Sequence, residues 1–315
     1  MNIEQGYREL QEKLSPQQWT EVLIKEAIKV AKKIQANAVL FYMDSTKDIG
    51  PFLDLRTDMK LILLTKREEC INKASRLPVN AVRIPDVRLS RVGYLKMGFL
   101  SAMSKGLVNE GDVIVCVGGV PEQGYMDTVM IVNTASEIEL FAGGSMLKFP
   151  EHFRPEVFDT LMILAMELAY EGREGKPVGT IFVLGDHEKV LELSRQLVFN
   201  PFEGRPESEL NINNDMVRES IKEFASIDGA FVIRDDGVVL AAGRYLNVAF
   251  PDIKLPQGLG ARHAAAAAIT NATDSVAITI SESTGKVTVF KEGKILTEIE
   301  RPAPEQGTKG GFPVV

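Results

Sequence analysis

The sequence predicts an α/β protein composed of two domains. Its 315 residues exceed the usual size of a single domain. In the first half, short apolar segments alternate with segments of helical spacing, which indicates a parallel sheet covered by helices. In the second half, strictly alternating segments joined by glycine turns indicate antiparallel strands as well. We therefore expect a parallel α/β domain followed by a domain with a mixed sheet flanked by helices.

Charge and composition exclude several classes of protein. The formal net charge of −7 argues against broad nucleic-acid binding, which depends on a basic surface. We find no basic and apolar leader and no apolar run of membrane-spanning length, so we expect a cytoplasmic protein with no membrane partner. Cys70 and Cys116 lie in or beside apolar segments. They cannot form a disulfide framework, and we expect both to be buried.

The first half opens with a long amphipathic helix. Ser15 is suited to cap it, and Pro16 is suited to its first position. Apolar residues then recur at helical spacing as far as Ala31. The elements expected after this helix are strands at 38–42, 60–65, 81–84, 113–117 and 127–132, and helices at 68–77 and 94–106.

Turn-forming residues separate the two halves. The segment 133–137 is polar, and 142–145 is rich in glycine and serine. We place the boundary at Ser145, which gives domains of 1–145 and 146–315. In the second domain Pro155 opens a helix, and 178–184 is a buried strand. A hairpin then joins 231–234 to 238–242, and strands follow at 276–280, 286–290 and 295–299.

A glycine-rich loop precedes the strongest helix-forming tract of the chain. Gly258 and Gly260 are followed by Arg262, His263 and a run of alanines. Free N–H groups at a helix start favour phosphate, and the two side chains add donors there. A loop before a core helix, with a solvated arginine and a satisfied histidine, explains this stretch alone equally well.

A carboxylate upstream favours the functional interpretation. Asp228 precedes the first strand of the hairpin, whose turn is already supplied by residues 235–237. Asp228 therefore needs another explanation. The ordered motifs Asp-Gly-Ala, Gly-Arg-Tyr-Leu, Gly-Ala-Arg-His and Ser-Glu begin at residues 228, 243, 260 and 281. Together they resemble the diadenylate cyclase domain, over roughly 153–299.

This resemblance implies a reaction and assigns roles to residues. Such domains condense two ATP molecules into cyclic di-AMP. Asp228 would hold a divalent metal, Mg²⁺ or Mn²⁺, and help to deprotonate the attacking hydroxyl. Arg262 and His263 would neutralise phosphate charge. Leu246 would lie against adenine, although a core leucine is nearly as good an interpretation. The remaining ATP-binding positions implied are Gly229, Ala230, Gly260, Ala261, Ser281 and Glu282.

The product also implies a pair of subunits. Each ATP acts once as nucleophile and once as electrophile, whereas one domain offers a single set of these residues. Two protomers should therefore meet face to face in a homo-oligomer.

Two departures from the family pattern keep an alternative open. Bacterial members commonly have a threonine where this chain has Ala261, and an arginine where it has Ala264. The lost arginine could weaken triphosphate binding or transfer its task to Arg244 or to a partner subunit. The alternative is a sensor that binds ATP or cyclic di-AMP without making it. A purely structural assembly protein would not need Asp228, Arg262 and His263 together.

The first half resembles the C-terminal α/β domain of pyruvate kinase, over roughly residues 15–135. The resemblance rests on the stretch from Arg88 to Pro121, which includes Gly118 and Gly119. In pyruvate kinases this domain carries effector and subunit contacts, and the catalytic barrel is a separate domain that this chain lacks. A regulatory or assembly role is implied for 1–145, and pyruvate kinase activity is not.

Overall fold

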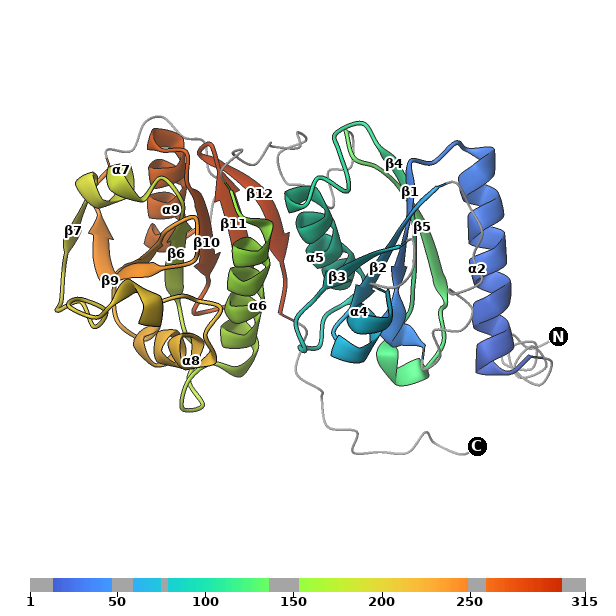
Figure 1. Ribbon diagram of the computed structural model, residues 1–315, viewed down its shortest axis with the longest axis horizontal. Helices are drawn as coiled ribbons and strands as arrows, with labels where there is room; N and C mark the ends of the chain where they lie inside the picture. Colours follow the sequence, from blue (N-terminus) through green and yellow to red (C-terminus); the bar gives the residue numbers. More distant parts are fainter. Residues whose placement is uncertain (1–13, 47–58, 75–78, 136–152, 249–258, 302–315) are drawn as a thin grey trace.

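The computed structural model describes residues 14–46, 59–74, 79–135, 153–248 and 259–301. These residues form two α/β halves that lie side by side, each with its own sheet (Figure 1). The predicted boundary at Ser145 and the first loop glycine, Gly258, lie outside the described residues. The boundary therefore stays a prediction.

The first half is a five-stranded sheet between helices. Its strand order is β3-β2-β1-β4-β5. One face packs against α2 and α4, and the other face packs against α5. The strands are β1 (Ala38–Tyr42), β2 (Lys60–Thr65), β3 (Asn80–Arg83), β4 (Val113–Gly118) and β5 (Thr128–Asn133). The helices are α2 (Pro16–Lys33), α4 (Glu68–Ala74) and α5 (Arg91–Ser104), with 3-10 turns η1 (Met43–Ser45) and η2 (Pro121–Gln123).

Helix α2 begins as its sequence indicates. Ser15 caps it: its hydroxyl accepts the amide N–H of Gln18, and the Gln18 side chain accepts that of Ser15. The buried stripe contains Ile24, Ala27, Ile28 and Ala31, whereas Val22 and Val30 are exposed. The spacing therefore located the helix but overestimated the width of its apolar face.

One strand of the first sheet differs from the parallel arrangement expected. β1, β2, β3 and β4 are mutually parallel, but β5 runs antiparallel to β4. The reason is the short connection 119–127, because a parallel crossover needs a dozen residues or more. Gly119 lies in this connection, and a Cβ there would stand 2.3 Å from the main-chain oxygen of Tyr125. The glycines at the end of β4 therefore allow the tight turn that leads back into β5.

The second half is a seven-stranded mixed sheet with the order β12-β11-β10-β6-β8-β9-β7. β6 and β8 are parallel, and the other neighbours are antiparallel. Helices α6 and α8 cover one face, and α7 and α9 cover the other. The strands are β6 (Thr180–Leu184), β7 (Ser194–Gln196), β8 (Ala230–Ile233), β9 (Val239–Leu246), β10 (Val276–Ile280), β11 (Val287–Lys291) and β12 (Lys294–Ile299). The helices are α6 (Pro155–Glu171), α7 (His187–Glu192), α8 (Asp215–Phe224) and α9 (Ala261–Ala272), with a 3-10 turn η3 (Glu207–Glu209).

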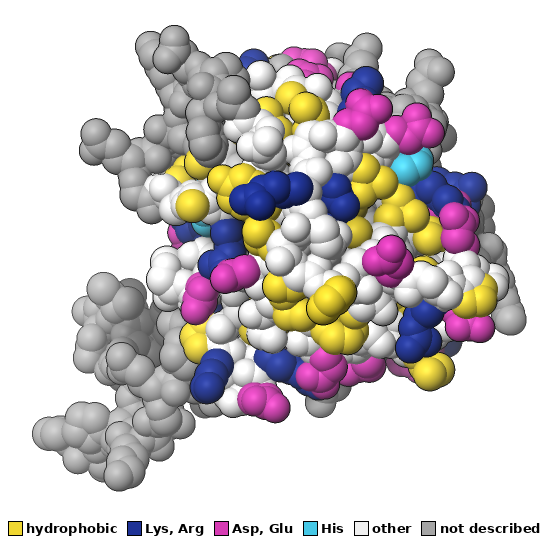
Figure 2. Space-filling model, turned by 90° about the vertical axis from the view of Figure 1, so that its left-hand side faces the viewer, with side chains coloured by type: hydrophobic (Ala, Val, Ile, Leu, Met, Phe, Trp, Pro, Cys, Tyr) yellow, Lys and Arg dark blue, Asp and Glu magenta, His cyan; other side chains and the backbone are white. Residues whose placement is uncertain are grey.

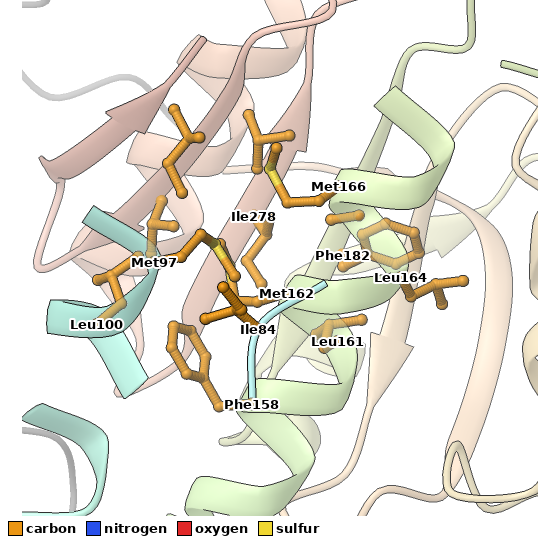
Figure 3. Close-up of a cluster of buried hydrophobic side chains, with 14 of the residues drawn as sticks. Ile84, Met97, Leu100, Phe158, Leu161, Met162, Leu164, Met166, Phe182 and Ile278 are labelled. Atoms are coloured by element: carbon orange, nitrogen blue, oxygen red, sulfur yellow. The ribbon is translucent and has the colours of Figure 1, made fainter. Parts of the chain in front are cut away.

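A continuous hydrophobic core joins the two halves. Helix α5 of the first half packs against α6 and against β12 of the second (Figure 1). Figure 3 shows Met97 and Leu100 of α5 beside Phe158 and Met162 of α6, and all four side chains are buried. Two halves with a shared core of this kind are not expected to rotate freely against each other.

Polar contacts fix the position of α5 within this junction. Asp159 of α6 accepts a hydrogen bond of 2.5 Å from the Ser101 hydroxyl and lies 2.8 Å from Nζ of Lys105. Burial raises the pKa of Asp159, so its negative charge depends on these partners. Lys96 donates to the main-chain oxygen of Glu298 in β12 at 2.8 Å.

Further expectations from the sequence can be compared with the structure. Cys70 and Cys116 are both buried and free, as predicted. Among the described residues, no helix is long and apolar enough to cross a membrane.

Candidate active site

A cleft of about 1310 Å³ opens on the α9 side of the second sheet. Its walls come from the segment before β8, the end of β9, the start of α9 and the end of β10. All the site residues predicted from the sequence line it, although they come from distant parts of the chain. These are Asp228, Gly229, Ala230, Leu246, Gly260, Ala261, Arg262, His263, Ser281 and Glu282.

Arg262 connects the two acidic sides of the cleft. Its guanidinium lies 3.4 Å from a carboxylate oxygen of Asp228 and 3.1 Å from one of Glu282. The carboxylates are well exposed, at 87% and 60% of their side-chain area, so both can bind a further partner. Because the pairs are loose and accessible, they are worth little as stabilising ion pairs.

The first turn of α9 points donors into the cleft. Gly260 precedes the helix, and no side chain caps it. Main-chain N–H groups of this turn are therefore available for an anion. His263 is only 6% exposed and packs edge-on against Phe290, with ring centroids 6.0 Å apart. Burial lowers the pKa of His263, so the neutral imidazole is favoured at neutral pH.

The backbone beside Asp228 is unusually close to its neighbour. Gly229 has φ of +111°, and a Cβ there would stand 2.6 Å from the carbonyl carbon of Gly243. The glycine is thus required by the packing of β8 against β9. This contact also fixes where Asp228 emerges at the rim.

The matches with known proteins follow this geometry. Residues 167–295 match the family model described as DisA bacterial checkpoint controller nucleotide-binding. A protein named diadenylate cyclase from Methanocaldococcus jannaschii is 34% identical over 299 residues, covering 88% of this chain and 96% of that protein. The chain belongs to the diadenylate cyclase family.

Further matches concern both halves of this cyclase. A diadenylate cyclase from Haloferax volcanii is 38% identical over 213 residues, covering 66% of this chain and 76% of that protein. Residues 20–141 match a family described as "Probable sensor domain DacZ_P". A pyruvate kinase structure from Cryptosporidium parvum is 15% identical, covering 37% of this chain and 23% of that chain, with a TM-score of 0.32. The match to the sensor family covers most of the first half of the cyclase.

The apolar end of the cleft contains Leu246. Its side chain is 7% exposed and belongs to the core beneath α9, yet it also lines the cleft. Leu197 and Tyr245 continue this wall and are half exposed. The two interpretations of Leu246 are therefore compatible, because one of its faces packs inward and another borders the cleft.

Arg244 cannot take over the task of the missing arginine without losing its present contacts. Its guanidinium donates to the Ser194 hydroxyl at 2.8 Å and to the main-chain oxygens of Ser194 and Leu191 at 2.8 and 2.9 Å. These bonds attach β9 to the end of α7. Arg244 in the cyclase thus holds β9 against α7 and β7, and its participation in phosphate binding stays a prediction.

Two groups of residues in or beside the cleft were not selected from the sequence. Gly179 lies against Arg262 and Glu282, because a Cβ built there would stand 2.7 Å from Nη1 of Arg262 and 2.8 Å from Cβ of Glu282. Lys286 and Glu298 line the cleft beside His263, whose imidazole is close enough for both charges to influence its pKa. The sheet register brings them there, and the sequence offers no signal for that pairing.

Proposed function

We propose that this cleft condenses two ATP molecules into cyclic di-AMP and releases two pyrophosphates. The observation that carries the proposal is the meeting of Asp228, Arg262 and Glu282 at the mouth of one cleft, in a chain of the diadenylate cyclase family. In each half-reaction a ribose 3′-oxygen forms a bond to the α-phosphorus of the other nucleotide. The bond from that phosphorus to the pyrophosphate oxygen breaks.

The residues around Arg262 supply positioning and charge. Arg262 and the free N–H groups of α9 stabilise the extra negative charge on the α-phosphate as the bond forms. Neutral His263 donates or accepts a hydrogen bond beside them. Asp228, which is well exposed at the rim, accepts the proton of the attacking hydroxyl. The walls formed by Leu246 and Tyr245 hold the base.

The site also suits a divalent metal, Mg²⁺ or Mn²⁺. Among the described residues no group of three or more His, Cys, Asp or Glu side chains is arranged to hold an ion alone. Asp228 and Glu282 nevertheless face the same space, and Mg²⁺ typically takes one or two carboxylates and completes its shell with phosphate oxygens and water. We propose Asp228 as the principal protein ligand. A bound ion there would acidify the 3′-hydroxyl and neutralise phosphate charge.

We propose further that two protomers face each other across their clefts. An exposed apolar patch borders the cleft at the β7 end of the sheet. Figure 2 views the molecule from this end. Phe199 in this patch is fully exposed, at 100%, and nothing within the described chain accounts for that exposure. The patch comprises Leu197, Val198, Phe199 and Tyr245. A second cleft brought against this rim would cover it and place the two nucleotides in opposite orientations.

For the first half we propose a regulatory or assembly role, with the domain ending near Ser145. Its match to a sensor family supports this, as does its direct packing against the cyclase sheet through α5. The proposed roles of the cleft residues all lie in the second half.

The decisive experiment is to incubate the purified protein with ATP and Mg²⁺ or Mn²⁺ and identify the product by mass. Wild type should form cyclic di-AMP, and Asp228→Asn should form none while keeping the wild-type circular dichroism spectrum and thermal midpoint. Asp228 is exposed and outside the core, so its loss should not affect folding. Binding of ATP or cyclic di-AMP without turnover by wild type would instead favour the sensor alternative.

A further inference from the structure

The cleft extends beyond the predicted site residues into a polar recess under the start of α9. Three neighbouring strands form its floor, because Thr279 of β10 pairs with Thr288 of β11, which pairs with Glu298 of β12. Side chains paired in this way project from the same face of a sheet. Lys286 lies on the same face, two residues before Thr288, and lines the cleft together with Glu298.

The recess contains a cation with a loosely held counter-charge. Nζ of Lys286 lies 3.1 Å from a carboxylate oxygen of Glu298 and 3.8 Å from one of Glu300. The Lys286 side chain is 29% exposed, so its ammonium group is reachable from the cleft. His263 lies close enough to both charges for them to affect its pKa, and it directly follows Arg262 in the sequence.

A buried hydroxyl completes the recess. The Thr288 Oγ1 atom is fully buried and has no hydrogen-bond partner among the residues described. Thr288 does not itself line the cleft, but its hydroxyl keeps the strand face beneath Lys286 and Glu298 polar.

The cationic side chains of the cleft differ in whether they are already held by other protein groups. Among the described residues, the arginine and lysine side chains that line the cleft are Arg244, Arg262 and Lys286. Arg244 is engaged with three oxygen acceptors around α7 and β7, and Arg262 lies between two carboxylates. At position 264, where a second arginine would follow His263 in α9, this chain has an alanine. Because Arg262 is assigned to the α-phosphate, Lys286 is the cation among the described cleft residues that is left for the outer phosphates.

We propose that Lys286 binds the β- and γ-phosphates of ATP, with Glu298 as its counter-ion in the empty cleft. This inference rests on the proposed function, since it adds a residue to the same ATP site. The α-phosphate lies at Arg262 and Asp228, and the two outer phosphates extend past His263 into the recess. Lys286 thereby supplies from β11 the positive charge that Ala264 does not supply from α9.

The test compares ligands with and without the outer phosphates. We use 3′-deoxyATP, which lacks the attacking hydroxyl and cannot react, and AMP, and we measure both affinities by calorimetry with Mg²⁺ present. Lys286→Met should weaken 3′-deoxyATP roughly 10- to 100-fold, the usual range for a hydrogen bond to a charged group, and leave AMP unchanged. Lys286→Arg should keep most of the affinity. Glu298→Gln should act in the opposite direction and tighten 3′-deoxyATP but not AMP.

Lys294→Met is the matched control. Lys294 is exposed at the start of β12 and does not line the cleft, so the variant removes the same charge without touching the recess. Wild-type affinity of Lys286→Met for 3′-deoxyATP, or an equal loss for both ligands, would overturn the proposal. If wild type bound neither ligand, or made no cyclic product from ATP, the proposed function itself would fail. Should Lys286→Met not fold, the opposite shift expected of Glu298→Gln still decides the proposal.

Discussion

Gly179 offers a direct test of how tightly the proposed site residues Arg262 and Glu282 must be positioned. An alanine Cβ at this position would stand 2.7 Å from Nη1 of Arg262, 2.8 Å from Cβ of Glu282 and 3.1 Å from its amide nitrogen. The arginine tip can swing away, but Cβ of Glu282 is attached to the backbone that leaves β10. It would have to move by about 0.6 Å to reach an ordinary contact of 3.4 Å.

We expect Gly179→Ala to lower kcat/KM roughly 10- to 100-fold. Misplacement of a reacting group by about 1 Å can cost ~10²-fold, and the displacement here is of the same order. Overpacking should also destabilise the fold by about 1–3 kcal/mol. The assay is the initial rate of cyclic di-AMP formation at saturating and limiting ATP, together with the thermal midpoint.

Gly260→Ala provides the comparison within the same cleft. A Cβ at Gly260 meets nothing within 4 Å, and its φ of −80° suits any residue. Because glycine is a better helix N-cap than alanine, the thermal midpoint should fall slightly, without the clash expected at Gly179, and any effect on catalysis should appear in the KM for ATP. Wild-type kcat/KM in a folded Gly179→Ala protein would refute the view that Glu282 and Arg262 must be held in place.

Four further perturbations test His263, the cleft rim and the shared core. His263→Ala should lower the rate by ~10²–10³ while leaving part of the ATP affinity measured by calorimetry, because the helix N–H groups remain; an unchanged rate would mean that the histidine is only a core residue. Since burial lowers the pKa of His263, the unfolded chain binds this proton more readily, and wild type should lose stability in urea titrations as the pH falls from about 6.5; His263→Gln should reduce that slope. Phe199→Ser should leave the thermal midpoint unchanged. When the protein is diluted, the specific activity of this variant should begin to fall at a higher protein concentration than that of wild type. Equal dilution curves would exclude a role of Phe199 in pairing. Leu100→Ala, in the shared core, should lower the free energy of unfolding by about 2–5 kcal/mol and shift the urea transitions of both halves. Trp19 fluorescence reports on the first half, and residual cyclase activity reports on the second. A shift of one transition alone would contradict a common core.

Local signals in the sequence were sufficient for most elements of the fold. Capping by Ser15 and Pro16 located α2, and the turn at 235–237 located the hairpin of β8 and β9. The direction of β5 was wrong, because periodicity does not report the direction of a strand and only the length of the preceding connection decides it. Helix α8 was not predicted, and neither was β7, which is only three residues long.

The candidate site residues were selected from ordered motifs rather than from capping, turn or periodicity signals. Ordered motifs selected residues that line one cleft, but the distances between them depend on the sheet register, which no local pattern specifies. The pairing of Thr288 with Glu298 is an example, because this register places Glu298 beside Lys286. Gly179 and Arg262 are far apart in the sequence, so their close approach could not be predicted for the same reason. The common core of α5 and α6 likewise arises from tertiary packing.

The position of α5 also determines which border of the cyclase sheet is protected. β12 and β7 are the outermost strands, and outermost strands carry main-chain groups that can template pairing with another chain. Helix α5 packs against β12, and Lys96 binds the main-chain oxygen of Glu298 there. Removing the first half would uncover this border and expose the apolar face of α6 beside it. A truncated second half should therefore tend to aggregate through β12, and dimers of such a fragment in a sizing experiment would not report the pairing that brings two clefts together.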